Sequence, residues 1–109
     1  MPLTLQEAQL VSWKVFRKIN DRLDVSNGRP RNPFVMVTDI LDEAGEAAAT
    51  VKDLEGFKSA DKPKTKEMLA GELSDLLYTV FVLAEHYGLN LEETFLEHVN
   101  EYLLRFITD

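Results

Sequence analysis

Four stretches of helical hydrophobic periodicity, separated by clusters of helix-breaking residues, most constrain how this chain can fold. The breakers run from Ser26 to Pro33, from Gly56 to Pro63 and from Gly88 to Asn90. Between these clusters apolar residues recur at steps of three and four, the spacing of one face of an α-helix. No stretch alternates apolar and polar residues with period two, so no strand is indicated. We therefore predict an all-α fold of four helices joined by short loops, in one domain over residues 1–109.

Capping residues mark the expected helix ends. Thr4 to Glu7 reads as a capping box, and Asn32-Pro33 reads as a cap followed by a first-turn proline. We expect the third helix to begin between Asp61 and Pro63 and to stop at Gly88, and Asn90 to cap the fourth. The apolar stripes expected to be buried are, in chain order, Leu5, Ala8, Val11, Val15, Phe16, Ile19 and Leu23; Val37, Ile40, Leu41, Ala44, Ala47, Ala48 and Val51; Leu69, Leu73, Leu76, Leu77, Val80, Leu83 and Ala84; and Leu91, Phe95, Val99, Leu103 and Phe106.

The charge balance excludes several classes of partner. Nineteen Asp and Glu against twelve Lys and Arg give a formal net charge of −7 and a pI near 4.8. Nucleic-acid polymers and anionic membranes attract proteins with a surplus of cations, so neither is an expected partner. The sequence shows no apolar run of membrane-spanning length, no leader and no cysteine. We expect a cytoplasmic protein without disulfides.

Two pairs of carboxylates in the middle helices form the candidate site. Glu43 and Glu46 lie three residues apart in the second predicted helix, and Glu72 and Asp75 lie three apart in the third. Residues at this spacing project from the same side of a helix, and each pair flanks an apolar stripe. If the two helices pack through their stripes, the pairs can face each other across one groove.

None of these four carboxylates has a basic residue three or four positions away. Solvated acidic faces usually interleave Lys or Arg at those positions, although exposed acidic pairs are common on helices. Two carboxylates about 5 Å apart repel by roughly 3 kcal/mol at an effective dielectric constant of about 20, so a shared groove calls for a cation. Oxygen ligands without His or Cys favour Mg²⁺ or Mn²⁺. Gly45 and Gly71 favour close approach of a helix or ligand, because glycine inside a helix costs about 1 kcal/mol relative to alanine.

The paired motifs resemble a known family. Glu43-x-x-Glu46 followed, after 25 residues, by Glu72-x-x-Asp75 is similar to the MazG-like nucleotide pyrophosphohydrolases of the all-α NTP pyrophosphatase superfamily. The similarity runs from about residue 34 to residue 106. It implies that the four carboxylates coordinate Mg²⁺, with Mn²⁺ as the alternative, and that Glu43 or Glu46 orients or deprotonates the attacking water.

The resemblance also implies an activity and an assembly. A nucleoside triphosphate would be cleaved between its α- and β-phosphates to give the monophosphate and pyrophosphate, which would remove non-canonical or surplus nucleotides. Relatives work as dimers or dimers of dimers, so a homodimer or homotetramer that forms an oligomeric helical bundle is expected.

Other residues are candidates for binding the substrate. Trp13 can stack on a nucleobase or form an oligomer contact, and Tyr78 can touch substrate or pack in the core. Asn100 and Arg105 lie in the last helix, where the family often has Asn-x-Lys and a later Arg, but Tyr102 stands at the lysine position. Arg105 or the cluster of Lys62, Lys64 and Lys66 can take the place of that lysine, although the stretch from Lys58 to Lys66 is also consistent with a solvated loop and helix start.

Three alternative functions remain open. Within the superfamily, a phosphoribosyl-ATP pyrophosphatase or a dUTPase- or dCTPase-type enzyme carries the same motifs. From another class, a non-catalytic helical module that binds a partner protein is consistent with the missing lysine and the short chain.

Overall fold

The computed structural model describes residues 2–27, 32–57 and 63–107, and these are helical apart from the connections between helices. The helices are α1 (Leu5–Asn27), α2 (Pro33–Leu54), α3 (Lys66–His86) and α4 (Leu91–Phe106). The all-α prediction is confirmed. No helix within the described ranges has a segment both long and apolar enough to cross a membrane.

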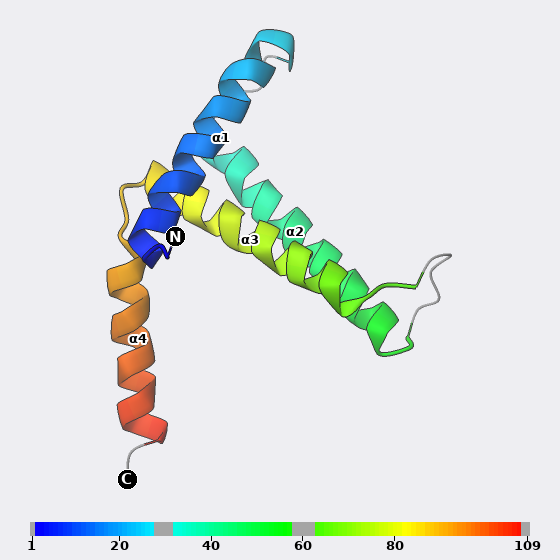
Figure 1. Ribbon diagram of the computed structural model, residues 1–109, viewed down its shortest axis with the longest axis vertical. Coiled ribbons are helices and arrows are strands. Elements are labelled where there is room, and N and C mark those ends of the chain that lie inside the picture. The colour runs from blue at the N-terminus through cyan, green and yellow to red at the C-terminus, as the bar shows by residue number, and fades with distance from the viewer. Residues whose placement is uncertain (1, 28–31, 58–62, 108–109) are drawn as a thin grey trace.

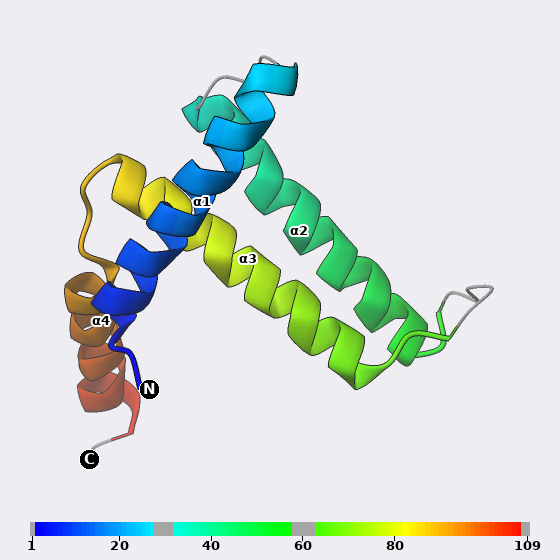
Figure 2. The same ribbon diagram turned by 45° about the horizontal axis from the view of Figure 1, so that its top comes forward.

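The helices form an open arrangement. Helices α2 and α3 run side by side in opposite directions, α1 crosses the C-terminal half of α3, and α4 points away from the α2–α3 pair (Figures 1 and 2). The radius of gyration is 17.0 Å and the principal extents are 57 × 41 × 30 Å. A compact domain of about 100 residues has a radius of gyration near 13 Å, so much of the surface of this chain is available to a partner.

Local sequence signals explain most helix ends. The amide of Thr4 donates to the Glu7 carboxylate at 2.9 Å and the amide of Glu7 donates to Thr4 Oγ1 at 3.1 Å, which completes the predicted capping box. Hydrogen bonds from the backbone and the side chain of Thr4 to the Glu7 carboxylate lower the pKa of Glu7, since they stabilise its ionised form. Asn32 accepts from the Phe34 amide at 2.8 Å, and Asn90 accepts from the Glu93 amide at 3.2 Å, both as predicted.

The start of α3 differs from the prediction. Thr65, and not a residue between 61 and 63, caps the helix by accepting a hydrogen bond from the Met68 amide at 3.2 Å. Asp61 lies outside the described residues. Gly88 ends the helix as predicted: its φ of 67° is a left-handed conformation, and the Leu89 amide donates back to the carbonyl of Ala84 at 2.9 Å.

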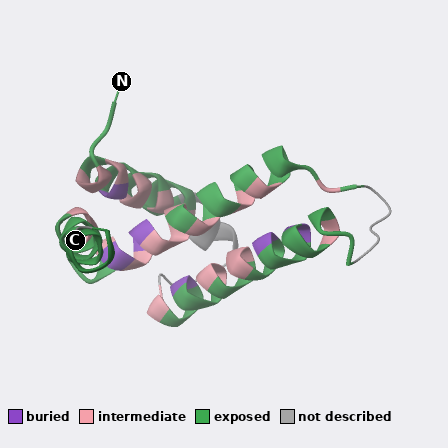
Figure 3. Cartoon of the chain, turned by 90° about the horizontal axis from the view of Figure 1, so that it is seen from below, coloured by how far each residue is buried: buried purple, intermediate pink, exposed green. Residues whose placement is uncertain are grey.

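Burial departs most from the predicted stripes. Helix α1 turns Gln9, Trp13 and Phe16 inward, while Val11 and Val15 of the predicted stripe are exposed. More than half of the predicted stripe is also exposed on α2 and α4, whereas on α3 only Leu73 and Leu77 of the stripe are exposed. Exposed positions predominate along the chain (Figure 3). The predicted stripe residues that prove exposed are Val11, Val15, Ile19, Val37, Leu41, Ala48, Val51, Leu73, Leu77, Phe95, Val99, Leu103 and Phe106; the side chain of Leu23 lies outside the described residues.

The physical reason is that several of the helices carry more apolar surface than their own chain covers. Helix α3 packs on α2 through one face and leaves Leu73 and Leu77, on another face, half exposed. Helix α4 has no buried residue among those described. Periodicity in the sequence identifies apolar faces, but it does not say which of two faces the same chain covers.

Candidate functional site

Helix α2 presents one acidic side chain on the face that packs against α3. This face follows alternating steps of four and three, and Met36, Ala47 and Thr50 on it are buried. Glu43 belongs to the same series and is half-buried between the turns that carry Ile40 and Ala47. Glu46 lies at the edge of this face and is exposed. A carboxylate therefore occupies a position where an apolar residue would otherwise pack.

Helix α3 matches this arrangement. Leu69, Leu76 and Leu83 recur with Glu72 at steps of three, four and seven, and all four residues are half-buried. Asp75, three residues after Glu72, is exposed. Each middle helix thus has one half-buried and one exposed carboxylate, and the two pairs come from adjacent antiparallel helices.

The electrostatics of Glu43 show that the pairs interact. Its pKa is raised, first by burial and then by the negative charges of Glu46 and Asp75, by a hydrogen bond with Glu46 and by the charge of Asp39. Asp75 acts across the α2–α3 interface, so carboxylates that are distant in the sequence share one local field. Nearby like charges raise a carboxyl pKa because they disfavour ionisation.

Two carboxylate oxygens in this interface lack a hydrogen-bond partner. Oε2 of Glu43 and Oε1 of Glu72 are each buried from solvent, and neither atom is hydrogen-bonded. Within the described ranges, no basic side chain is paired with Glu43, Glu46, Glu72 or Asp75. Buried polar atoms are normally satisfied, so these two oxygens need an explanation such as an ion or a proton.

The carboxylates do not form a closed metal cage in this arrangement. Among the described residues, no group of three or more His, Cys, Asp or Glu side chains is arranged so that it can hold one ion. Acidic side chains that repel one another separate, and the two exposed members can rotate about their side-chain bonds. The oxygen donors and their positions on facing helices therefore fit a cation. The side chains would have to rotate for their oxygens to reach one ion.

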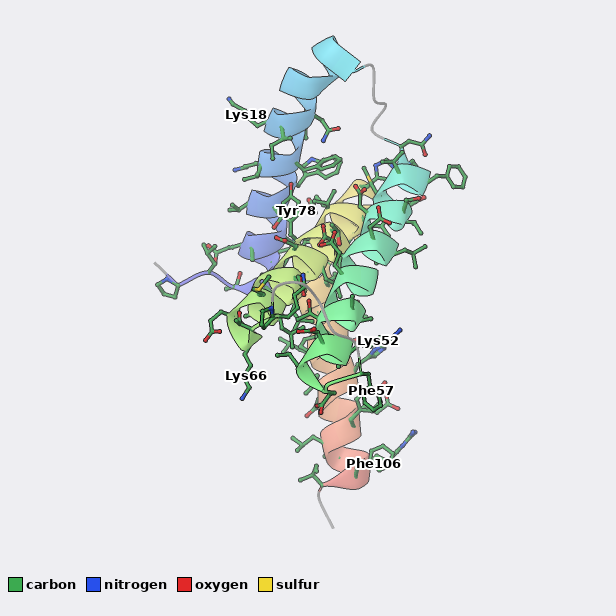
Figure 4. The ribbon with its side chains drawn as sticks, turned by 90° about the vertical axis from the view of Figure 1, so that its right-hand side faces the viewer. Lys18, Lys52, Phe57, Lys66, Tyr78 and Phe106 are labelled. Atoms are coloured by element: carbon green, nitrogen blue, oxygen red, sulfur yellow. The ribbon has the colours of Figure 1, made fainter. Side chains whose placement is uncertain are left out.

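A narrow cleft lies one helical turn from these carboxylates, where α1 meets α2 and α3. Asp39 precedes Glu43 by four residues on α2, and Tyr78 follows Asp75 by three on α3. Because the two helices are antiparallel, both steps lead to the same end of the interface. Tyr78 lies at this crossing of helices (Figure 4), and burial and the Asp39 charge raise the pKa of its hydroxyl. The cleft is lined by Phe16, Met36, Asp39, Tyr78, Thr79 and Val82.

The other predicted binding residues have different locations. The Trp13 ring stacks on Phe16 at 5.8 Å and lies 6.2 Å from the ring of His86, so its neighbours lie within the chain. Asn100 and Arg105 are exposed on α4, which extends away from the α2–α3 pair (Figure 1). The guanidinium of Arg105 contacts the Glu101 carboxylate at 3.4 Å. A single chain therefore does not bring these α4 residues to the acidic interface.

The lysines and glycines singled out in the sequence add little within one chain. Lys66 extends outward at the start of α3 (Figure 4), Lys64 is half-buried beside it, and Lys58 and Lys62 lie outside the described residues. A Cβ added to Gly45 or Gly71 meets nothing within 4 Å, so no close approach within the chain explains either glycine.

Two residues of this region were not identified from the sequence. Asp39 adjoins both Glu43 and Tyr78, and its position one turn before Glu43 was the available signal. Gln9 is fully buried; its amide donates to the Glu85 carboxylate at 2.9 Å and to the carbonyl of Leu89, and its carbonyl accepts from the Leu91 amide at 3.4 Å. Gln9 thus holds the α3–α4 turn against α1 through these hydrogen bonds. A glutamine within a helical stretch does not indicate such a role from the sequence alone.

A four-helix domain with carboxylate pairs on two antiparallel helices defines the MazG-like class of all-α pyrophosphohydrolases. The family model described as phosphoribosyl-ATP pyrophosphohydrolase matches residues 29–101, and the chain belongs to this family. It is also similar to the uncharacterized protein YvdC of Bacillus subtilis (strain 168), with 30% identity over 80 residues that cover 68% of this chain and 76% of that protein. No solved structure matches the chain significantly. The family resemblance inferred from the paired motifs is confirmed.

Proposed function

We propose that the protein is a Mg²⁺-dependent nucleoside triphosphate pyrophosphohydrolase that releases a nucleoside monophosphate and pyrophosphate. The observation that carries this proposal is the pair of buried, unpartnered oxygens on Glu43 and Glu72, which lie on facing helices. A divalent cation would satisfy both oxygens and offset the repulsion that raises the Glu43 pKa. Hard oxygen donors of this kind suit Mg²⁺, with Mn²⁺ as the alternative.

The four carboxylates have distinct roles in this proposal. Glu43 and Glu72 are the inner ligands because they are half-buried at the interface, and Asp75 completes the set from the rim. Glu46 is exposed, so within the first pair it is the residue that can take up and orient a water molecule. Bound Mg²⁺ supplies positive charge to the phosphate oxygens and to the pyrophosphate leaving group.

The test is pyrophosphate release from a panel of ribo- and deoxyribonucleoside triphosphates, with Mg²⁺ and with chelator. We expect release from at least one nucleotide with Mg²⁺ only. Glu72→Gln and Asp75→Asn should each lower kcat/KM by about a hundredfold or more, the effect of removing one preorganised electrostatic group from an active site. Glu97→Gln, on the exposed surface of α4, is the control and should keep full activity. Circular dichroism of each variant verifies its fold.

A second substrate is favoured by one observation. The family model that matches the chain is described as phosphoribosyl-ATP pyrophosphohydrolase, and this reaction also releases pyrophosphate from a triphosphate chain. Phosphoribosyl-ATP therefore belongs in the same panel, and a preference for it over every simple triphosphate would replace nucleotide house-cleaning as the function. Absence of pyrophosphate from all substrates would instead favour a non-catalytic binding module.

We also propose that the protein works as a homodimer or homotetramer. Each helix has an apolar face that its own chain leaves uncovered, for example Val11 and Val15 on α1 and Leu73 and Leu77 on α3. An apolar groove of about 420 Å³ lies between α1, α3 and α4, and a second apolar groove lies on α4 around Val99 and Leu103. A second copy presents equally apolar faces, and burying both removes large exposed patches from water. Sedimentation at several protein concentrations tests the assembly.

A further inference from the structure

Thr50 is a further buried polar group in the interface between α2 and α3. It is fully buried on the α2 face that packs against α3, and among the described residues its hydroxyl oxygen has no hydrogen-bond partner. A hydroxyl within a helix commonly donates to the carbonyl one turn earlier, as Thr38 does to the carbonyl of Phe34 at 2.9 Å. Thr50 makes no such bond within the described ranges. Because a buried donor without an acceptor is costly, we expect an acceptor within its reach.

The register of the two helices shows which part of α3 faces Thr50. The charge of Asp75 acts on Glu43 across the interface, so these two residues lie at a similar level of the helix pair. In antiparallel helices, a step forward along one matches a step back along the other. Thr50 follows Glu43 by seven residues, and it therefore lies level with Met68, which precedes Asp75 by seven. Glu72 lies about one helical turn from Met68.

A hydrogen bond at the end of the helix pair agrees with this register. The Lys64 amide donates to the Asp53 carboxylate at 2.8 Å. Asp53 follows Thr50 by three residues, and Lys64 precedes Met68 by four. Both observations therefore place Thr50 beside the first turn of α3.

The direction of helical side chains brings Thr50 and Glu72 toward each other. A side chain on an α-helix leans toward the N-terminus of its own helix and covers the preceding turn. Glu72 therefore leans toward the level of Met68, which is the level of Thr50. Thr50 in turn leans back along α2, toward the level of Glu72. Oε1 of Glu72 is also buried and without a partner among the described residues, so the acceptor that Thr50 needs is available there.

We propose that the Thr50 hydroxyl donates a hydrogen bond to Oε1 of Glu72 and thereby holds this carboxylate in the direction of the cation site. The inference rests on the proposed pyrophosphohydrolase function and adds a positioning residue to it. A carboxylate has about four lone-pair sites, so Glu72 can accept this hydrogen bond and still coordinate a cation. The bond requires rotation about side-chain bonds, which is open to both residues because neither atom is engaged with another described residue.

Cation affinity measures this role without hydrolysis. Electron paramagnetic resonance of free Mn²⁺ gives the Kd of the protein for this ion. Thr50→Val keeps the shape of the side chain and removes the hydroxyl, and it should raise the Kd by about tenfold to a hundredfold, the usual cost of losing a residue that orients a metal ligand. Thr50→Ser restores the hydroxyl and should restore the affinity. Thr38→Val, the same substitution at an exposed hydroxyl of α2, is the control and should leave the Kd unchanged.

Stability in the presence of chelator tests the hydrogen bond itself. Thr50→Val should lower Tm by about 5 °C or more, because it leaves a buried carboxylate oxygen without its donor. Glu72→Met removes the acceptor and keeps the length of the side chain, so in this background Thr50→Val should leave Tm unchanged or raise it. If Thr50→Val does not fold, Thr50→Ser and Thr50→Ala, which differ only by the hydroxyl, give the same comparison.

Failure of the proposed function and failure of this inference give different results. If the wild type binds no Mn²⁺ and hydrolyses no nucleotide, the proposed function fails, and the unfolding comparison alone decides whether Thr50 and Glu72 are bonded. Equal Mn²⁺ affinity of the wild type and Thr50→Val overturns the positioning role and leaves the pyrophosphohydrolase proposal intact. A rise in Tm on Thr50→Val while Glu72 is present, or an equal fall in Tm in Glu72→Met, overturns the hydrogen bond.

Discussion

Replacing Glu43 by glutamine should stabilise the protein in the absence of divalent cations, although it removes a proposed ligand. Glu43 is half-buried, and Glu46, Asp75 and Asp39 each oppose its ionisation. A like-charge pair three or four positions apart on one helix costs about 0.2–0.5 kcal/mol, which applies to Glu46 and Asp39. With the charge of Asp75 on α3 added, we take the total repulsion to be about 1 kcal/mol. Glutamine keeps the size of the side chain and removes this repulsion. For a domain of this size, about 1 kcal/mol corresponds to a rise in Tm of about 4–8 °C.

The pH dependence of this gain follows from the direction of the pKa shift. The folded-state pKa of Glu43 lies above its ordinary value of 4.5, so folding favours the protonated carboxyl. The resulting stabilisation is fully present below the unfolded pKa and is lost as pH rises through the folded pKa. The advantage of Glu43→Gln should therefore be largest near neutral pH and should vanish near pH 4.

Magnesium should reverse the order of stability. A ligand that binds only the folded state adds about 2.7 kcal/mol at a hundred times its Kd, and the wild type should gain this while Glu43→Gln gains much less. Thermal unfolding followed by circular dichroism, at one protein concentration with chelator or Mg²⁺ and at pH 7 and pH 4, measures all three effects. Glu97→Gln is the surface control and should change stability by no more than about 0.5 kcal/mol.

One result would refute this reasoning directly. If Glu43→Gln melts below the wild type at pH 7 with chelator present, the carboxylate is making favourable contacts and is not a strained, uncompensated charge. An advantage of the same size at pH 4 would likewise show that the gain is unrelated to ionisation.

Four further predictions concern the assembly, two glycines and the buried glutamine. Val99→Lys, in the uncovered stripe of α4, should weaken self-association by at least about a hundredfold in sedimentation, since it buries an unpaired charge, whereas Glu97→Lys on the opposite side of α4 should not. Gly45→Ala should raise the free energy of unfolding by about 1 kcal/mol, because its Cβ meets nothing within 4 Å; a loss would reveal that a second chain or a ligand approaches that helix. Gly88→Ala should lower it by about 1 kcal/mol, because its φ of 67° disfavours a side chain. Gln9→Leu should cost about 2 kcal/mol in chemical unfolding, because the Leu91 amide and its other partners lose a buried hydrogen-bonding group.

Sequence reasoning succeeded where short-range chemistry decides the structure. Helix number and most ends follow from capping residues and a glycine with positive φ, such as Asn32, Asn90 and Gly88, whose effects act within a few residues. The paired carboxylates were recognised because their spacing and their lack of basic neighbours are visible in the chain itself. The start of α3 was misplaced because Thr65 caps the helix two residues after Pro63, and several other polar residues of that connection are equally plausible caps from the sequence alone.

The buried faces could not be predicted because several helices have two apolar sides. On α2, Leu41 and Val51 belong to a wider stripe than the one that packs against α3, yet Met36 and Thr50 on the narrower stripe are the buried residues. Which of two apolar faces is buried depends on the element that packs against it. The sequence of one chain does not say whether that element belongs to the same chain or to a second copy. The position of Asp39 was missed for a related reason, since its significance comes from Tyr78 on another helix.

The carboxylates in the α2–α3 interface and the uncovered apolar faces have related consequences for stability. The interface between α2 and α3 places Glu43 and Glu72 where leucine or alanine would contribute packing energy, so it gives up stability at its centre. An open chain with a radius of gyration of 17.0 Å has little other burial to offset that loss. Under the proposed function and assembly, stability would come from outside the single chain, from a cation that neutralises the carboxylates and from a second copy that covers α4. Chelator and dilution should therefore destabilise the protein together: the midpoint of unfolding should fall with protein concentration, and it should fall further without Mg²⁺. A midpoint independent of both would mean that the open chain is stable by itself.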